Sequence, residues 1–233
     1  MKETMLTVQV GQEVLDCKWR VGAVRRFNLR LRGDGTLSLS TPTGTPRERA
    51  ERFLSEQTPF LTRALARQRS RIPLPADGEE EAVLFGRRLP LTVLPSHRTD
   101  YLLREEGITL YLPEDTPEAR AACLSRLRRE ALSERISVLI ERHLSAAAPA
   151  CPPPSFALRQ MKSRWGSCRP DHSRLTFALS LALLPPPLIE LVVVHELCHL
   201  SHPDHSPRFY AALDAVLPDA AQRRSSLRAY RVP

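Results

Sequence analysis

The chain has 233 residues and a formal net charge of +8 at pH 7; 42% of its residues are hydrophobic and 26% are charged. This balance is typical of a globular protein and excludes a disordered or fibrous chain. The most apolar stretch, residues 175–200, contains three consecutive prolines and Glu190, so it cannot supply the roughly 20 unbroken apolar residues of a membrane helix.

Strand patterns dominate the first hundred residues. Residues 24–32 and 36–41 alternate between apolar and polar side chains, as half-buried strands do. Between them, Gly33-Asp34-Gly35 offers residues that tolerate the positive φ of a tight turn. The pattern predicts a β-hairpin.

A helical pattern follows from about Pro46 to Arg69, with Thr45 as a candidate N-cap and Pro59 as a break. Two further short hairpins are predicted, one around Gly86 and one around Glu105-Glu106-Gly107.

The longest helical pattern begins at Pro117 and runs to about Ala148, where a proline-rich linker over 149–154 follows. Beyond the linker, a strand over 156–161, a polar loop over 163–174 and a second strand over 175–183 precede another helix. The apolar stripe that indicates the long helix consists of Leu124, Leu127, Ala131, Leu132, Ile136, Leu139, Ile140 and Leu144.

The last of these helices would begin at Pro187 and carries His195, Glu196 and His199 in the pattern H-E-x-x-H. Four residues of an α-helix turn through about 400°, so the two imidazoles lie on one face and can hold one metal ion. The Glu196 carboxylate is offset by about 100°, which places it beside the metal. There it can take a proton from the attacking water, as in zinc hydrolases.

A catalytic zinc needs a third protein ligand and an open position for water, and His205 is the candidate. Pro203 disfavours helical conformation at His202, so the helix should stop there and let the chain turn back. His202 is the alternative third ligand, since histidine tolerates positive φ in a turn. The spacing of His195, His199 and His205 equals that of H-E-x-x-H-x-x-G-x-x-H proteases, with His202 in the glycine position.

The run Lys162-Ser163-Arg164-Trp165-Gly166-Ser167-Cys168 precedes a strand, and Val192 to Leu200, Asp204-His205-Ser206 and Phe209-Tyr210 follow it. In this order and spacing, the sequence resembles the YgjP-like metallopeptidase family. The resemblance extends more loosely upstream, through Phe85-Gly86-Arg87 and the Gly33 hairpin. It implies an α+β fold with a zincin-like core, metal ligands at His195, His199 and His205, and Glu196 as catalytic base.

The chain departs from the family pattern at three positions. Ala178 and Asp204 stand where asparagine is usual, and Leu191 stands where an aromatic residue is usual. None of these removes a ligand, but a carboxylate at Asp204 could orient a ligand histidine. We expect residues 116–233 to form the zincin-like region and residues 1–115 a β-rich N-terminal region, both within one family-length unit.

Arg164 has two alternative roles: it can stabilise a developing oxyanion, or it can pair with a carboxylate. Trp165 packs in the core or contributes to a substrate site. The strand before Ser163 is suited to pairing with an extended peptide. Cys168 and Cys198 are interpreted as apolar fillers rather than nucleophiles, and His97, His143 and His172 as isolated residues.

Arginine accounts for 31 of the 34 basic residues. Either this reflects a compositional bias or it gives a basic surface that attracts nucleic acid or nucleotides. The five cysteines are scattered and form no C-x-x-C pair, which argues against a disulfide framework. The N-terminus lacks an apolar run of signal-peptide length, so we expect a cytoplasmic protein.

These observations predict a metal-dependent hydrolase, most simply a zinc peptidase with Glu196 as general base. Three imidazoles suit Zn²⁺, with Ni²⁺ or another late first-row ion as alternatives. The expected partner is a peptide or protein substrate. One rival is a hydrolase of nucleotide phosphoanhydrides, supported by the arginine excess. Another is a nucleic-acid-binding module with a structural metal, although closed structural sites normally use four ligands.

Overall fold

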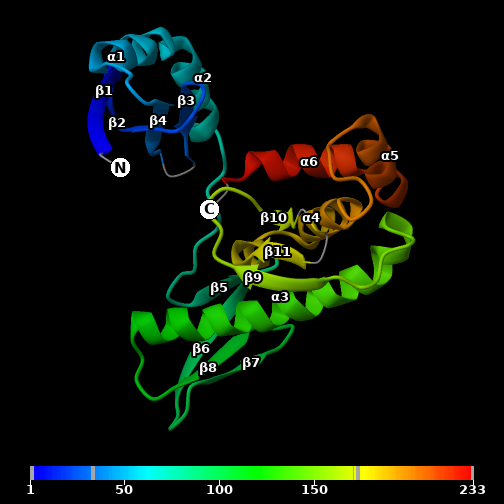
Figure 1. Cartoon of the computed structure of the whole chain (residues 1–233). Coiled ribbons are helices and arrows are strands. Elements are labelled where there is room, and N and C mark those ends of the chain that lie inside the picture. Colours follow the sequence, from blue (N-terminus) through cyan, green and yellow to red (C-terminus); the bar gives the residue numbers. More distant parts are fainter. Residues whose placement is uncertain (1–2, 33–34, 170, 172–173, 232–233) are drawn as a thin grey trace. The chain divides into compact units, whose positions relative to one another are not determined.

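The computed structural model describes residues 3–32, 35–169, 171 and 174–231. The chain folds into two compact units (Figure 1). Unit 1 contains residues 1–72 and 231–233, and unit 2 contains residues 73–230. Among the helices of these described ranges, none is long and apolar enough to cross a membrane.

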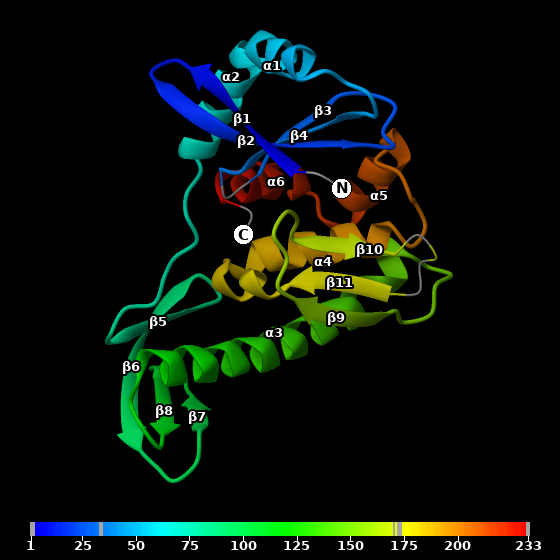
Figure 2. The same cartoon turned by 60° about the vertical axis from the view of Figure 1, so that its left-hand side comes forward.

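Unit 1 is a four-stranded sheet with two helices on one face (Figure 2). The strands β1 (Glu3–Val10), β2 (Glu13–Gly22), β3 (Asn28–Leu31) and β4 (Leu37–Pro42) lie in the order β1-β2-β4-β3. Only the β2–β4 pair is parallel. Helices α1 (Arg47–Glu56) and α2 (Thr58–Arg69) bury Ala50, Leu54 and Leu61 against the apolar residues of the sheet, including Leu6, Trp19 and Leu39.

The predicted first hairpin is confirmed, because β3 and β4 pair antiparallel. Gly35 has a φ of 85°, while Gly33 and Asp34 lie outside the described residues. Thr45 is not the cap of α1, because its hydroxyl donates to the Pro42 carbonyl and Pro46 is the N-cap residue. The helix breaks at Gln57, which leaves Pro59 in the first turn of α2, where a missing N–H costs nothing.

Unit 2 begins with a second four-stranded sheet, in the order β5-β6-β8-β7. Its strands are β5 (Glu81–Leu84), β6 (Arg87–Pro95), β7 (Asp100–Leu103) and β8 (Ile108–Leu112). The predicted hairpins around Gly86 and around residues 105–107 are confirmed as the antiparallel pairs β5–β6 and β7–β8.

Helix α3 (Pro117–Ala147) runs across this sheet and on beside the C-terminal part of unit 2 (Figure 1). The boundary between the two units lies at residues 72/73. Helix α3 belongs to the same unit as β5, and the Arg128 guanidinium of α3 donates to the Val83 carbonyl and pairs with Asp77. The division of the sequence into regions 1–115 and 116–233 stays a prediction. Most of the predicted α3 stripe is buried, but Ala131 and Leu144 are only half-buried.

The C-terminal part contains a three-stranded sheet and three helices. Strands β9 (Ser155–Arg159), β10 (Gly166–Cys168) and β11 (Arg174–Ala178) lie in the order β10-β11-β9. Strand β11 is shorter than predicted and continues as the 3₁₀ turn η1 (Leu179–Leu183), and the predicted polar loop contains β10. Helices α4 (Pro186–Cys198), α5 (Pro207–Val216) and α6 (Ala220–Ala229) complete the α+β fold.

Candidate active site

Helix α4 carries the H-E-x-x-H residues through the middle of unit 2, in contact with α3, α5, α6 and β10. It begins at Pro186, one residue before the predicted start. Packing on several sides explains why its sequence is apolar nearly all round, since Ile189, Val193 and Val194 are fully buried. Besides Glu190, the polar residues here are His195, Glu196 and the C-cap residue His199, which therefore stand out as exceptions to the core pattern.

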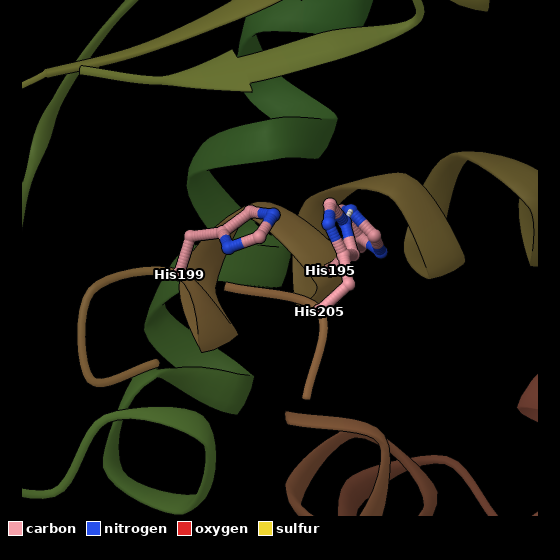
Figure 3. Close-up of side chains that lie close together, drawn as sticks. All are labelled: His195, His199 and His205. Atoms are coloured by element: carbon pink, nitrogen blue, oxygen red, sulfur yellow. Dashed lines mark hydrogen bonds between the residues drawn. The ribbon is translucent and has the colours of Figure 1, made fainter. Parts of the chain in front are cut away.

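The structure brings His195, His199 and His205 together. One ligand-type nitrogen from each residue lies within 4.8 Å of the others, and Nε2 of His205 is 3.1 Å from Nε2 of His195. Figure 3 shows the His199 ring directed toward the other two rings. The buried Phe209 ring of α5 contacts all three imidazoles, with centroid distances of 4.6–4.9 Å, and so supports the cluster from one side.

The chain turns back immediately after the second histidine. The His202 N–H donates to the Cys198 carbonyl at 2.9 Å, which closes the last turn. Nδ1 of His199 lies 3.0 Å from the His202 carbonyl oxygen. Because a carbonyl only accepts hydrogen bonds, this contact places the proton on Nδ1 and leaves the Nε2 lone pair of His199 for a metal. The His202 side chain is not in the ligand cluster, so His202 enters the site through its backbone.

Burial and the neighbouring His199 and His205 lower the pKa of His195 to about 3. The imidazole is therefore neutral at pH 7, which is the protonation state that coordinates a metal. Glu196 is only 5% exposed, and burial raises its pKa to about 8. The backbone N–H of Cys168 and the charge of Arg164 act in the opposite direction. At pH 7 this carboxyl is therefore mostly protonated in the metal-free protein, and a cation held by the neighbouring imidazoles would lower its pKa.

Strand β10 lies directly against Glu196. A Cβ added to Gly166 would be 2.7 Å from Oε1 and 2.8 Å from Cγ of Glu196, closer than van der Waals contact allows. Only glycine fits between the strand and the carboxylate. The sequence does not predict this close approach, because Gly166 is interpreted there as a turn residue.

Two hollows meet at these residues and share Arg164, Gly166, His195, Glu196 and His205. The first has a volume of about 410 Å³ and adds β10 residues, His199 and Arg169. The second has a volume of about 320 Å³ and is more apolar, with three arginines among its walls. Besides the shared residues, it is lined by Trp165, Leu191, Val192, Tyr210, Arg224, Leu227 and Arg228.

Arg164 is exposed at the edge of both hollows, and no salt bridge joins it to a carboxylate among the residues the structure describes. Arg208, which is near the ligands in sequence, and Lys162 line neither hollow. Arg224 and Arg228 do so from α6, although nothing in their local sequence marks them as site residues. Trp165 is both buried and part of the wall of the second hollow.

The strand beside the site is β10 and not the strand before Ser163. In the order β10-β11-β9, strand β9 lies at the opposite edge of the sheet, while β10 residues line the first hollow. The edge suited to pairing with an extended peptide at this site is therefore that of β10.

None of the other described residues singled out from the sequence belongs to the histidine cluster. Burial raises the pKa of Cys168 and of Cys198 to about 11, so neither is a ready nucleophile. His143 is not isolated, because its Nε2 lies 2.8 Å from Glu190. His97 is exposed, and His172 lies outside the described residues. The Asp204 carboxylate accepts from the Ser206 N–H at 3.2 Å, which orders the turn before α5.

The comparison with protein families agrees with this description. The model of a family described as "YgjP-like, metallopeptidase domain" matches residues 25–230. Among solved structures, the metallopeptidase zymogen abylysin of Pyrococcus abyssi matches with 20% identity and a TM-score of 0.36. That match covers 40% of this chain and 90% of the abylysin chain. No curated protein matches the chain.

Proposed function

The chain belongs to the YgjP-like family of metallopeptidase domains, and from this premise we propose that it is a zinc peptidase that cleaves an extended peptide at the His195, His199 and His205 cluster. The observation that carries the proposal is the meeting of three metal-competent imidazoles with one buried carboxylate, Glu196, at the junction of two hollows.

The donor set fits a late first-row divalent ion. Three neutral imidazoles suit zinc, and nickel is the main alternative, whereas magnesium prefers oxygen ligands. Three protein ligands leave the position that a catalytic zinc requires, while a closed structural site normally has four. When bound, zinc would supply a Lewis acid that polarises the scissile carbonyl and lowers the pKa of water.

The side chains around the cluster would perform the remaining chemistry. Glu196 would accept the proton of the attacking water and deliver it to the leaving amine. Arg164, which lines both hollows, would stabilise negative charge on the carbonyl oxygen. The β10 edge would hold the peptide backbone, and the hollows would take side chains on either side of the scissile bond.

A nucleoside triphosphate is the competing substrate. The specific observation in its favour is that Arg164 and Arg169 line the first hollow, while Arg224 and Arg228 line the second. Against it, the lining contains no glycine-rich phosphate cradle among the residues described. The β10 residues that line the first hollow favour an extended peptide instead, because a strand edge can pair with a peptide backbone.

We place this activity in the cytoplasm. All five cysteines are free thiols, as is usual in a reducing compartment. The substrate would then be a cytoplasmic peptide or an unfolded protein segment.

The test uses zinc-loaded protein incubated separately with a quenched-fluorescence peptide library and with nucleoside triphosphates. We expect peptide cleavage that Glu196→Gln reduces by at least about 100-fold while zinc content stays unchanged, because the amide cannot accept the water proton. Glu141→Gln, at an exposed position of α3, is the control and should behave as wild type. Release of phosphate or pyrophosphate without peptide cleavage, lost in Glu196→Gln, would favour the competing substrate.

A further inference from the structure

We propose that the helix-free face of the unit 1 sheet binds the phosphate backbone of a nucleic acid. This site is separate from the metal cluster and does not depend on the peptidase activity. The proposal rests on the alternation of side chains along three neighbouring strands, β2, β4 and β3, and on the register in which these strands pair.

The alternation divides each strand between two faces. On β2, Cys17 and Trp19 are buried beneath the helices, so Asp16, Lys18 and Arg20 point to the other face, where all three are exposed. On β4, the buried Leu37 and Leu39 alternate with half-buried serines at 38 and 40.

Strand β3 continues the same face. Leu29 packs against the core of unit 1, whereas Asn28 and Arg30 are exposed. Arg32, just beyond the strand, is exposed as well. The face that carries no helix is thus polar on all three strands, and it has two cations on β2 beside Asp16 and two on β3 or just beyond it.

The register places the cations on both sides of a row of hydroxyls. Ser38 pairs with Lys18 on one side and with Arg30 on the other. In the next polar row, Ser40 pairs with Arg20 and with Asn28. Together these residues line a hollow of about 350 Å³, whose described lining contains four cations, of which Lys18 and Arg20 also have partners within the protein.

The dimensions of this array suit a chain of phosphates. Polar rows lie about 7 Å apart along a strand, and side chains on β2 and β3 lie about 10 Å apart across β4. One free phosphate would engage only part of such an array, whereas a polynucleotide backbone presents several phosphates to it. The hydroxyl and amide groups between the cations can donate to phosphate oxygens.

The face lacks the features of base recognition. The aromatic residues Trp19 and Phe27 belong to the core side of unit 1, and the lining of the hollow contains no aromatic side chain among its described residues. Stacking on bases is therefore excluded as the main contribution. The binding should be independent of sequence and strongly dependent on salt.

The test measures fluorescence anisotropy of a labelled 20-base-pair DNA duplex of random sequence with the full-length protein at 50, 100 and 200 mM KCl. We expect wild type to bind with a log–log salt slope between about −2 and −4, since up to four cations contact phosphates. The double variant Arg30→Gln/Arg32→Gln should bind at least about 10-fold more weakly at 100 mM and lose about 1 to 2 units of slope.

The matched control is Arg63→Gln/Arg67→Gln, which removes the same charge from exposed positions of α2. It should stay within about 2-fold of wild type, because a local array and not net charge is responsible. Equal weakening in both variants, or no binding at 50 mM KCl, would overturn the proposal. The proposal would also be overturned if Arg30→Gln/Arg32→Gln weakened binding to vesicles rich in phosphatidylserine but left DNA binding unchanged. Failure of peptide cleavage would leave this measurement unaffected.

Discussion

Gly166 illustrates how one residue of β10 fixes the position of the general base. Gly166→Ala would put a Cβ 2.7 Å from Oε1 of Glu196, so the buried carboxylate would have to move. We expect peptide cleavage to fall by at least about 10-fold, since small displacements of a catalytic group are costly. Zinc content, measured by elemental analysis, should stay at the wild-type level. Gly78→Ala is the control, because its Cβ would meet only the Glu81 carbonyl at 4.0 Å; wild-type activity in Gly166→Ala would contradict this account.

Two histidines three residues apart contribute to the cluster in different ways. His205 offers a ring nitrogen 3.1 Å from that of His195, whereas His202 offers its backbone carbonyl to His199. His205→Ala should therefore weaken zinc binding by about 100-fold or more, while His202→Ala should change it only a few-fold. Competition with a chromogenic chelator measures both affinities, and the opposite ranking would make His202 the ligand.

The sequence predicts the chemistry of individual residues better than their surroundings. The spacing of His195 and His199 depends only on helix geometry, so it can be derived without a fold. The contacts of Gly166 with Glu196, and of Arg224 with the second hollow, depend on how β10 and α6 pack against α4. No local pattern encodes such contacts, because they join residues that are about 30 positions apart in the chain.

At the scale of elements, Glu190 holds three helices together. Its carboxylate accepts from Arg223 of α6 at 2.6 Å and lies 2.8 Å from Nε2 of His143 on α3. Burial alone would raise the pKa of Glu190, but these two partners hold it below its ordinary value of 4.5. A carboxyl whose pKa is lower in the folded than in the unfolded protein stabilises the folded state at any pH above its unfolded-state pKa. This contribution is lost as the pH falls through its folded-state pKa.

Glu190→Gln should lower the free energy of unfolding of the metal-free protein by about 1–3 kcal/mol at pH 7. The reason is that Arg223 and His143 would no longer face a charged carboxylate. The difference from wild type should shrink as the pH falls below about 4.5. Urea titrations at pH 7 and pH 3.5 measure both effects. Glu141→Gln, exposed on the same α3 helix, should show neither. A difference that grows toward low pH would contradict the assigned sign.

Helices and strands are predicted correctly where their hydrophobic pattern extends over many residues. The α3 stripe and the antiparallel hairpins are predicted because their periods of 3.6 and 2 repeat several times. Strand β10 has only three residues, Gly-Ser-Cys, and forms through pairing with β11, so no alternation announces it. The apolar run after β11 could be strand or helix, and it becomes the 3₁₀ turn η1.

At the scale of the whole molecule, the two units divide the proposed activities between them. Every residue of the metal cluster and its two hollows lies between positions 164 and 228, inside unit 2. The basic sheet face lies entirely in unit 1, which has a hydrophobic core of its own. The family match begins at residue 25, within unit 1, so it does not reveal this division.

This division predicts the behaviour of a fragment comprising residues 73–230. Because unit 2 contains the α4 histidines, Phe209 and the β10 edge, the fragment should bind one zinc ion with an affinity within a few-fold of the full chain. It should also cleave the same peptides, yet lose salt-dependent binding to DNA because the cations of unit 1 are gone. Far-UV circular dichroism first establishes that the fragment is folded. A folded fragment that binds no zinc would show that unit 1 helps to form the cluster, and one that keeps full DNA affinity would place the nucleic-acid site in unit 2.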